Sequence, residues 1–264
     1  HYPLRRQRQM CIRDRYTVLL IIFLTLIVDF YMNKTMKIGT EYGGWSVPKN
    51  IYLNSESIVY SAGVGEDISF DLQIQSLYGC FIFLIDPTLR SIVHYKEIKK
   101  YYKSKIWMSG FSGNIQKDYR KNIKNLDVDF SKIEYISKGL WNKKSRLKFY
   151  RQNKEKNVSQ TLIDNMFGTH YDLVQTLTIG DIMLEKKHKK IDLLKLDIEG
   201  AEIKVLENML KDNIYPKHLC IEFDLALKGK DKKGDTKKVI SKLESLGYKK
   251  IIDDNLNVTF SFQS

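Results

Sequence analysis

The sequence predicts an α/β fold with a mostly parallel sheet. From Ile38 onward, apolar strand-like segments alternate with helical segments, which is typical of successive β-α-β units. The segment Cys80–Asp86 is almost entirely apolar, as expected of a strand buried on both faces. Three predicted strands end in carboxylates, and ligands of open α/β sheets bind beyond the carboxyl ends of the strands. We therefore expect one domain with a binding site at that edge.

The first half of the domain contains two clear β-α units. We expect the first strand at Ser57–Ala62 and a helix from Ser69 to Leu77. The second strand, 80–86, precedes an amphipathic helix at Ile92–Tyr102. Residues 103–132 are polar and weakly periodic, which predicts an irregular or helical insertion.

The second half continues the alternation. Ile133–Trp141 is predicted to form the third strand and its loop, and Arg146–Asn153 alternates like a short extra strand. A buried strand follows from Ile191, then a helix at Ala201–Leu210 and a strand at His218–Asp224.

The C-terminal segment predicts one more helix and a hairpin. Lys228–Lys238 is predicted to be a solvated lysine loop, and Asp235 within it is expected to cap a helix that ends near Gly247. The last two strands are expected to form an antiparallel hairpin across Asn255.

Composition limits the class of protein. A chain of 264 residues with 43% hydrophobic residues can bury an ordinary core, which argues against general disorder. The three cysteines, Cys11, Cys80 and Cys220, show no paired spacing, so we expect neither a disulfide framework nor a zinc site.

The N-terminus differs from the remainder. Five of the nine arginines lie in the first 15 residues, and "RQMCIRDR" resembles the translation of a sequencing adapter. We interpret residues 4–15 as adapter read-through, with a genuine basic N-terminus as the alternative. The apolar segment that follows, within 16–31, is short for a membrane span. An anchor, a signal segment and a translated leader before Met32 or Met36 stay open. We therefore expect a leader or anchor within 1–37, a domain at 38–264, and a cytoplasmic protein with membrane contact open through 16–31.

The stretch "YSAGVGEDISFD" carries the main functional signal. Gly63 permits a tight turn after the first strand, and Gly65 permits close backbone approach to a ligand. Asp86 ends the next strand, at a spacing that suits a carboxylate bound to ribose hydroxyls.

Two features disfavour a dinucleotide. Ile68 stands where a third glycine is expected. Glu66 and Asp67 lie where a pyrophosphate would meet the helix N-terminus, and they would compete with it for the same amides. S-adenosylmethionine carries a ribose, a sulfonium and an ammonium but no phosphate, so it suits this turn better than a nicotinamide cofactor does.

The sequence resembles the FkbM family of S-adenosylmethionine-dependent methyltransferases. The resemblance rests on "VYSAGVGEDISFD", "IDPT" and "IDLLKLDIEGAEIKVLENML", with "IGTEYGGWSVP", "KGLWNKKSRLKFY" and "LCIEF" in the same order, over roughly residues 38–225. It implies a Rossmann-like class I fold with helices on both faces of a seven-stranded sheet, order 3-2-1-4-5-7-6, strand 7 antiparallel. It also implies methyl transfer, usually to a hydroxyl oxygen.

The resemblance implies roles for ten residues. Asp197 and Glu199 would face the reacting centre, where an acid can orient the acceptor hydroxyl or take its proton. The cofactor would contact the glycine turn, the acids beside it, the ribose-binding carboxylate and the residues after the third strand: Ser61, Gly63, Gly65, Glu66, Asp67, Asp86, Gly139 and Leu140.

One departure concerns the acceptor side. Asp224 stands where the family often has a histidine, which removes any acceptor-binding role that such a histidine would carry. The histidines of the domain show no metal spacing, so we expect no metal: His94, His170, His188 and His218.

The expected partner is a small-molecule or glycan acceptor. Residues 103–132 and 152–172 are expected to shape the pocket that binds it. The formal charge of +13 raises the alternative of a nucleic-acid methyltransferase. Against it, the lysines are dispersed, and "DIEG" replaces the Pro-Pro-aromatic run of base-amine methylases. A non-catalytic, membrane-tethered binding module is a further alternative. The oligomeric state is open.

Overall fold

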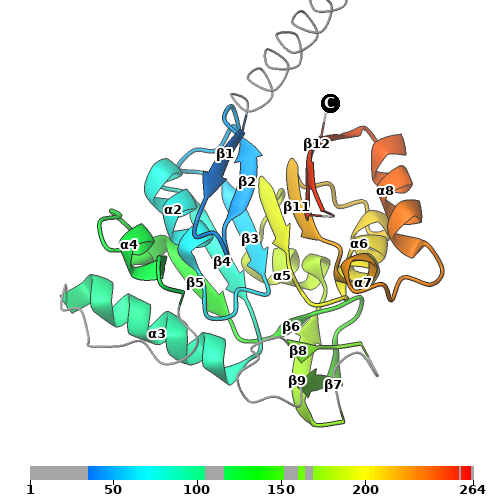
Figure 1. The fold of residues 1–264 in the computed structure, drawn as a ribbon, viewed down its shortest axis with the longest axis horizontal. Helices are drawn as coiled ribbons and strands as arrows, with labels where there is room; N and C mark the ends of the chain where they lie inside the picture. The colour runs from blue at the N-terminus through cyan, green and yellow to red at the C-terminus, as the bar shows by residue number, and fades with distance from the viewer. Residues whose placement is uncertain (1–34, 105–115, 152–159, 164–168, 256, 263–264) are drawn as a thin grey trace, which may run out of the picture. The chain divides into compact units, whose positions relative to one another are not determined.

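A computed structural model describes residues 35–104, 116–151, 160–163, 169–255 and 257–262 (Figure 1). Contacts divide the chain into two compact units, one of residues 1–37 and 47–51 and one of residues 38–46 and 52–264. Two short strands, β1 (Thr35–Ile38) and β2 (Trp45–Pro48), form a two-stranded sheet. The interpretations of residues 4–15 and 16–31 lie outside the described residues. Within the described ranges, the helices are too short or too polar to cross a bilayer.

A seven-stranded, mostly parallel sheet forms the centre of the larger unit, which confirms the predicted sheet. Its order is β12-β13-β11-β10-β3-β4-β5. The five strands from β11 to β5 pair in parallel, while β13 pairs antiparallel with both neighbours. The strands are β3 (Ile58–Ala62), β4 (Phe81–Ile85), β5 (Ile133–Ile136), β10 (Leu193–Leu196), β11 (His218–Glu222), β12 (Tyr248–Asp254) and β13 (Asn257–Phe262).

Helices cover both faces of this sheet because its strands are apolar on both sides. One face, which includes Tyr60 and Leu194, packs against the helices α5 (Ile179–Lys186), α6 (Glu202–Lys211) and α8 (Asp235–Ser245). The other face lies against α2 (Ser69–Tyr78), whose buried Asp71 interacts with Ser61 of β3 and Lys195 of β10. The remaining helical elements are α3 (Leu89–Ser104), α4 (Tyr119–Ile123), η1 (Phe130–Lys132) and α7 (Asp224–Leu227).

A second sheet of four strands was not predicted. It has the order β6-β9-β7-β8. The segment expected to be one third strand with its loop divides instead, since β5 joins the large sheet and Gly139–Leu140 joins the small one. The strands of the small sheet are β6 (Gly139–Leu140), β7 (Ser145–Arg151), β8 (Gln160–Thr161) and β9 (Tyr171–Leu177).

The C-terminal elements follow the prediction except at one cap. Asn255 has φ +51° at the turn of the antiparallel β12–β13 hairpin. Asp235 was expected to cap α8, but it is the first residue of that helix and makes no capping bond. The side chain of Asp231 accepts the N–H groups of Asp235 and Thr236 instead, because it lies one turn before them.

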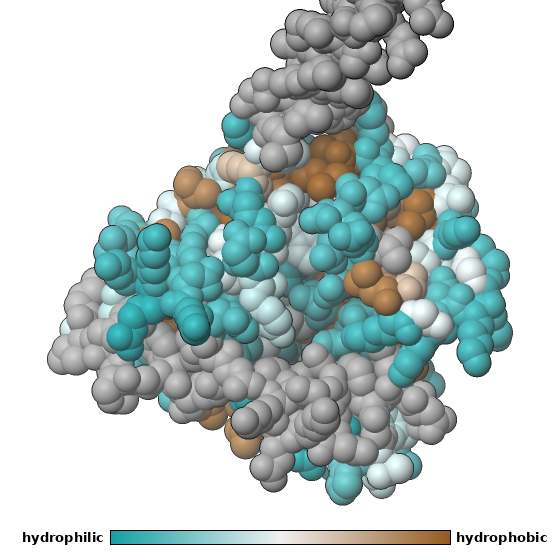
Figure 2. All heavy atoms as spheres, viewed as in Figure 1, coloured by the Kyte–Doolittle hydropathy of each residue, from teal (hydrophilic) through white to brown (hydrophobic). Residues whose placement is uncertain are grey.

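The surface is hydrophilic over most of the described area in view in Figure 2, and apolar residues appear there as separate patches. This agrees with a chain whose positive charge comes mainly from lysine. Cys80 and Cys220 are free thiols buried in the interior.

Candidate active site

A cavity of about 580 Å³ lies at the carboxyl ends of β3, β4, β10 and β11. This is the edge at which the sequence predicted a site. Nine of the ten predicted residues line it: Gly63, Gly65, Glu66, Asp67, Asp86, Gly139, Leu140, Asp197 and Glu199. Ser61 does not line the cavity, because it lies inside β3 on the face toward α2.

The glycine turn brings β3 and β10 into close contact. The Gly63 amide donates to the Ile85 carbonyl at 3.0 Å, and its φ is +80°. A Cβ on Gly63 would lie 1.6 Å from the carbonyl oxygen of Asp197. Only glycine fits here without moving the backbone that carries Asp197, so the turn and the candidate catalytic residue are held together.

Asp86 joins this turn to the end of β4. Its Oδ2 accepts the Gly65 N–H at 3.0 Å, and its Oδ1 accepts both the N–H and the hydroxyl of Thr88. Burial raises the pKa of this carboxyl, and the bonds from Thr88 and Gly65 oppose that shift. A carboxylate has about four acceptor positions. Three are used here, so one remains on Oδ2 for a single ligand hydroxyl.

The two acids after the turn are both engaged by the protein. Arg90 of α3 donates two hydrogen bonds to Glu66, from Nε at 3.0 Å and from Nη2 at 2.7 Å. Asp67 accepts the N–H of Ser69 at the start of α2 and the hydroxyl of Thr40. The prediction that Glu66 meets a ligand cation therefore changes, because Arg90 already balances that charge.

Lys195 is an unexpected partner of Asp197. It lies inside β10, its side chain is buried, and its Nζ is 3.3 Å from Oδ2 of Asp197. Burial alone would lower the pKa of Lys195, but Asp197 and Asp71 hold it above its ordinary value. The lysine therefore stays charged beside the candidate catalytic carboxylate.

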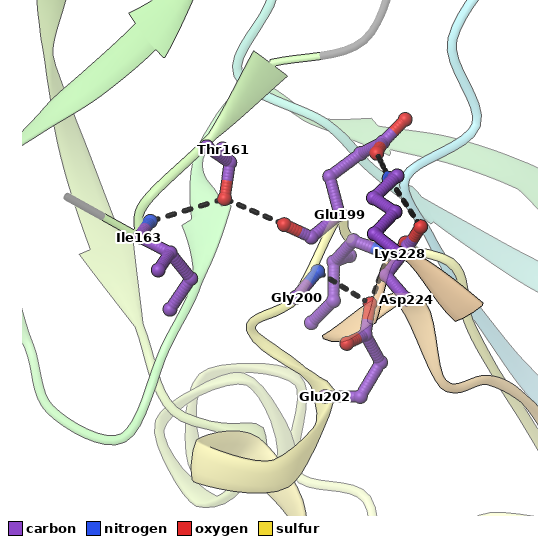
Figure 3. A network of polar contacts seen from close by, with 8 residues as sticks. Thr161, Ile163, Glu199, Gly200, Glu202, Asp224 and Lys228 are labelled. Atoms are coloured by element: carbon purple, nitrogen blue, oxygen red, sulfur yellow. Dashed lines mark hydrogen bonds and ion pairs between the residues drawn. The ribbon is translucent and has the colours of Figure 1, made fainter. Parts of the chain in front are cut away.

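Glu199 lies in a strained turn between β10 and α6. Its φ is +56°, and its carbonyl accepts the Thr161 hydroxyl at 2.6 Å (Figure 3). Figure 3 also shows Lys228 between the carboxylates of Glu199 and Asp224, with which it forms ion pairs. Below them, Glu202 accepts the N–H groups of Ile198 and Gly200 and so closes the turn.

Glu222 and Asp224, expected among the strand-end acids but given no individual role, also line the cavity. Burial, together with the nearby Asp197, raises the pKa of Glu222 to about 9. Burial, with Glu199 nearby, raises the pKa of Asp224 to about 6. Their signal in the sequence was their position at the carboxyl end of the strand next to β10.

Other segments complete the cavity. Gly139 and Leu140 of β6, predicted to contact the cofactor, line it together with Phe149 of β7. Tyr42, 68% exposed, contributes from the loop between β1 and β2. Part of the segments expected to shape the acceptor pocket lies outside the described residues, although Gln116 and Gln160 line the cavity.

Three histidines make hydrogen bonds to other side chains in the described structure. His94 bonds the hydroxyl of Tyr119, and His188 bonds that of Tyr60, both at 2.7 Å. His218 bonds Ser261 at 2.8 Å. These contacts give each of them a structural partner.

Comparison with known proteins gives one family. The model described as "Methyltransferase FkbM domain" matches residues 43–250, which include all the residues that line the cavity except Tyr42. No curated protein and no solved structure gave a significant match.

Proposed function

Since the chain belongs to the FkbM methyltransferase family, we propose that it transfers a methyl group from S-adenosylmethionine to a hydroxyl oxygen. The proposed acceptor is a sugar, a glycan or another small molecule. In the chain order of its seven strands, the large sheet reads 3-2-1-4-5-7-6 with strand 7 antiparallel, which supports the class I methyltransferase fold.

The observation that carries the proposal is the joined pair of turns after β3 and β4. Gly63 brings the backbone close, Gly65 donates to Asp86, and Asp86 keeps one acceptor position. A ribose hydroxyl can donate to that position. With seven carboxyl groups and two lysines in its described lining, the cavity disfavours a phosphate and suits a cation, so the residues fit S-adenosylmethionine.

The cofactor, when bound, supplies an electrophilic methyl on a sulfonium. The chain would position the acceptor: Asp197, which lines the cavity at the end of β10, would accept a hydrogen bond from the acceptor hydroxyl and receive its proton. Lys195, whose Nζ lies 3.3 Å from Oδ2 of Asp197, holds this carboxylate in position. Placing the hydroxyl in line with the methyl supplies the rest of the acceleration.

The charge of the cavity also separates this proposal from nucleic-acid methylation. Among the described residues, the cavity is lined by seven carboxylates and two lysines. A phosphate backbone would be repelled there. The lysines dispersed over the surface do not change the negative sign of the charge in the cavity.

Calorimetry with S-adenosylhomocysteine and NAD tests the cofactor. We expect saturable binding of S-adenosylhomocysteine and none of NAD. Asp86→Asn retains one oxygen for Thr88 but turns an amide N–H₂ toward Gly65, so it should weaken binding by about tenfold or more. Asp253→Asn, on the exposed part of β12, is the control and should bind normally.

Transfer of labelled methyl groups to mono- and oligosaccharides, compared with oligonucleotides, tests the acceptor class. Label in oligonucleotides alone would overturn the acceptor proposal. Binding of NAD with no binding of S-adenosylhomocysteine would overturn the cofactor.

A further inference from the structure

Three carboxylates converge where β10 and β11 end. Asp197, Glu222 and Asp224 each contribute one oxygen, and these three oxygens lie within 4.8 Å of one another. Two oxygens on opposite sides of one Ca²⁺ are about 5 Å apart, and those of one Mg²⁺ about 4.2 Å. Three oxygens this close together can contact a single ion of either size.

A buried oxygen at this cluster lacks a partner. Asp224 is 4% exposed and lines the cavity. Its Oδ1 is ion-paired with Lys228, whereas Oδ2 is buried and has no hydrogen-bond partner in the described part of the chain. Burying an acceptor without a donor is unfavourable, and more so for a charged group. A cation at the cluster would remove that cost.

The charge balance points the same way. Both lysines that line the cavity are already ion-paired, Lys195 with Asp197 and Lys228 with Glu199 and Asp224. With Glu199, the cluster has four carboxyl groups against these two lysines. A divalent cation would supply positive charge that the lining residues do not provide.

We propose that Asp197, Glu222 and Asp224 bind one divalent cation of the hard class, such as Mg²⁺, Mn²⁺ or Ca²⁺. The ligand chemistry decides the class, since all three ligands are carboxylate oxygens and soft metals prefer thiolate or imidazole. The sequence predicted no metal because the histidines lack metal spacing, and that reasoning did not weigh acids from two separate strands. The site extends the proposed function, because a cation beside Asp197 would bind acceptor hydroxyls.

Binding of Mn²⁺ to the full-length protein without cofactor, followed by electron paramagnetic resonance, tests the proposal. We expect one saturable Mn²⁺, displaced by excess Mg²⁺ or Ca²⁺. Glu222→Gln should weaken binding by at least about tenfold, because it removes one charged ligand. Glu207→Gln, on the exposed side of α6, is the matched control and should bind like wild type.

Further variants keep the test decisive. If Glu222→Gln does not fold, Asp197→Asn should show the same loss. Lys228→Met removes a competing cation and should tighten Mn²⁺ binding, provided that its circular dichroism matches wild type. Wild-type protein that binds no Mn²⁺ at millimolar concentration, or unchanged binding in both carboxylate variants, would overturn the proposal.

Binding of S-adenosylhomocysteine to the same samples separates the two proposals. Cofactor binding without Mn²⁺ binding would overturn the metal-site proposal alone. Mn²⁺ binding without cofactor binding would overturn the proposed function but support the metal site.

Discussion

Replacing Gly63 by alanine tests how closely the turn after β3 approaches the end of β10. The new Cβ would lie 1.6 Å from the carbonyl oxygen of Asp197, and the φ of +80° disfavours any side chain. The backbone conformation alone costs about 1–2 kcal/mol. The overlap adds about 1–3 kcal/mol, because a backbone atom must move.

Gly79→Ala is the matched control. Gly79 also has a left-handed φ, +63°, but the nearest atom to its added Cβ is 3.9 Å away. The control should therefore lose only the backbone contribution, about 1–2 kcal/mol. Urea denaturation measures both variants, and Gly63→Ala should lose about 2 kcal/mol more than Gly79→Ala.

Calorimetry supplies a second measurement on the same variants. Gly63→Ala should weaken the binding of S-adenosylhomocysteine by about tenfold or more, since the displaced backbone carries Asp197. Gly79→Ala should bind normally. Equal losses of stability in the two variants would show that the close approach of the strands is not real.

The remaining predictions concern charge and capping. Asp231→Ala should destabilise the protein by about 1 kcal/mol in thermal unfolding, because two N–H groups at the start of α8 lose their acceptor. Asp235→Ala should destabilise it clearly less. The reverse order would contradict the observed cap. Burial lowers the pKa of His218 to about 4, so the unfolded chain binds more protons than the folded one between pH 6.5 and 4. The free energy of unfolding should therefore fall as the pH drops through that range. His218→Gln should flatten this dependence of stability on pH. A double-mutant cycle of Glu66→Gln and Arg90→Ala should give a coupling energy of about 1–2 kcal/mol, and additive effects would show that the ion pair is unimportant.

Local sequence patterns predicted the large sheet and the glycine turn well. The turn could be predicted because Gly63, Gly65 and Asp86 act through backbone geometry and strand ends, which are visible in one sequence. The sequence predicted β7 as an extra strand but not the sheet that it joins, because the pattern of one strand does not identify its partners, β8 and β9. β6 has only two residues, too few for a periodic pattern.

Partners of the acids were harder to predict. Arg90, at the start of the helix after the second strand, pairs with Glu66. The sequence indicated this pair only by placing an arginine in a chain whose positive charges are mostly lysines. Lys195 carried a stronger signal, a charge inside an apolar strand, which indicates a buried ion pair. The convergence of Glu222 with Asp197 depends on strand adjacency, which emerges only from the sheet order.

The hydrogen bonds of Asp86 have a consequence for how a ligand enters. Gly65 and Thr88 hold this carboxylate through bonds within the protein itself, so the turn is preorganised and little ordering entropy is lost when a ribose binds. The Gly65 amide should then exchange slowly with deuterated water even before ligand is added. The ribose should accordingly bind without a change in the conformation of this turn. Any induced fit should take place on the acceptor side.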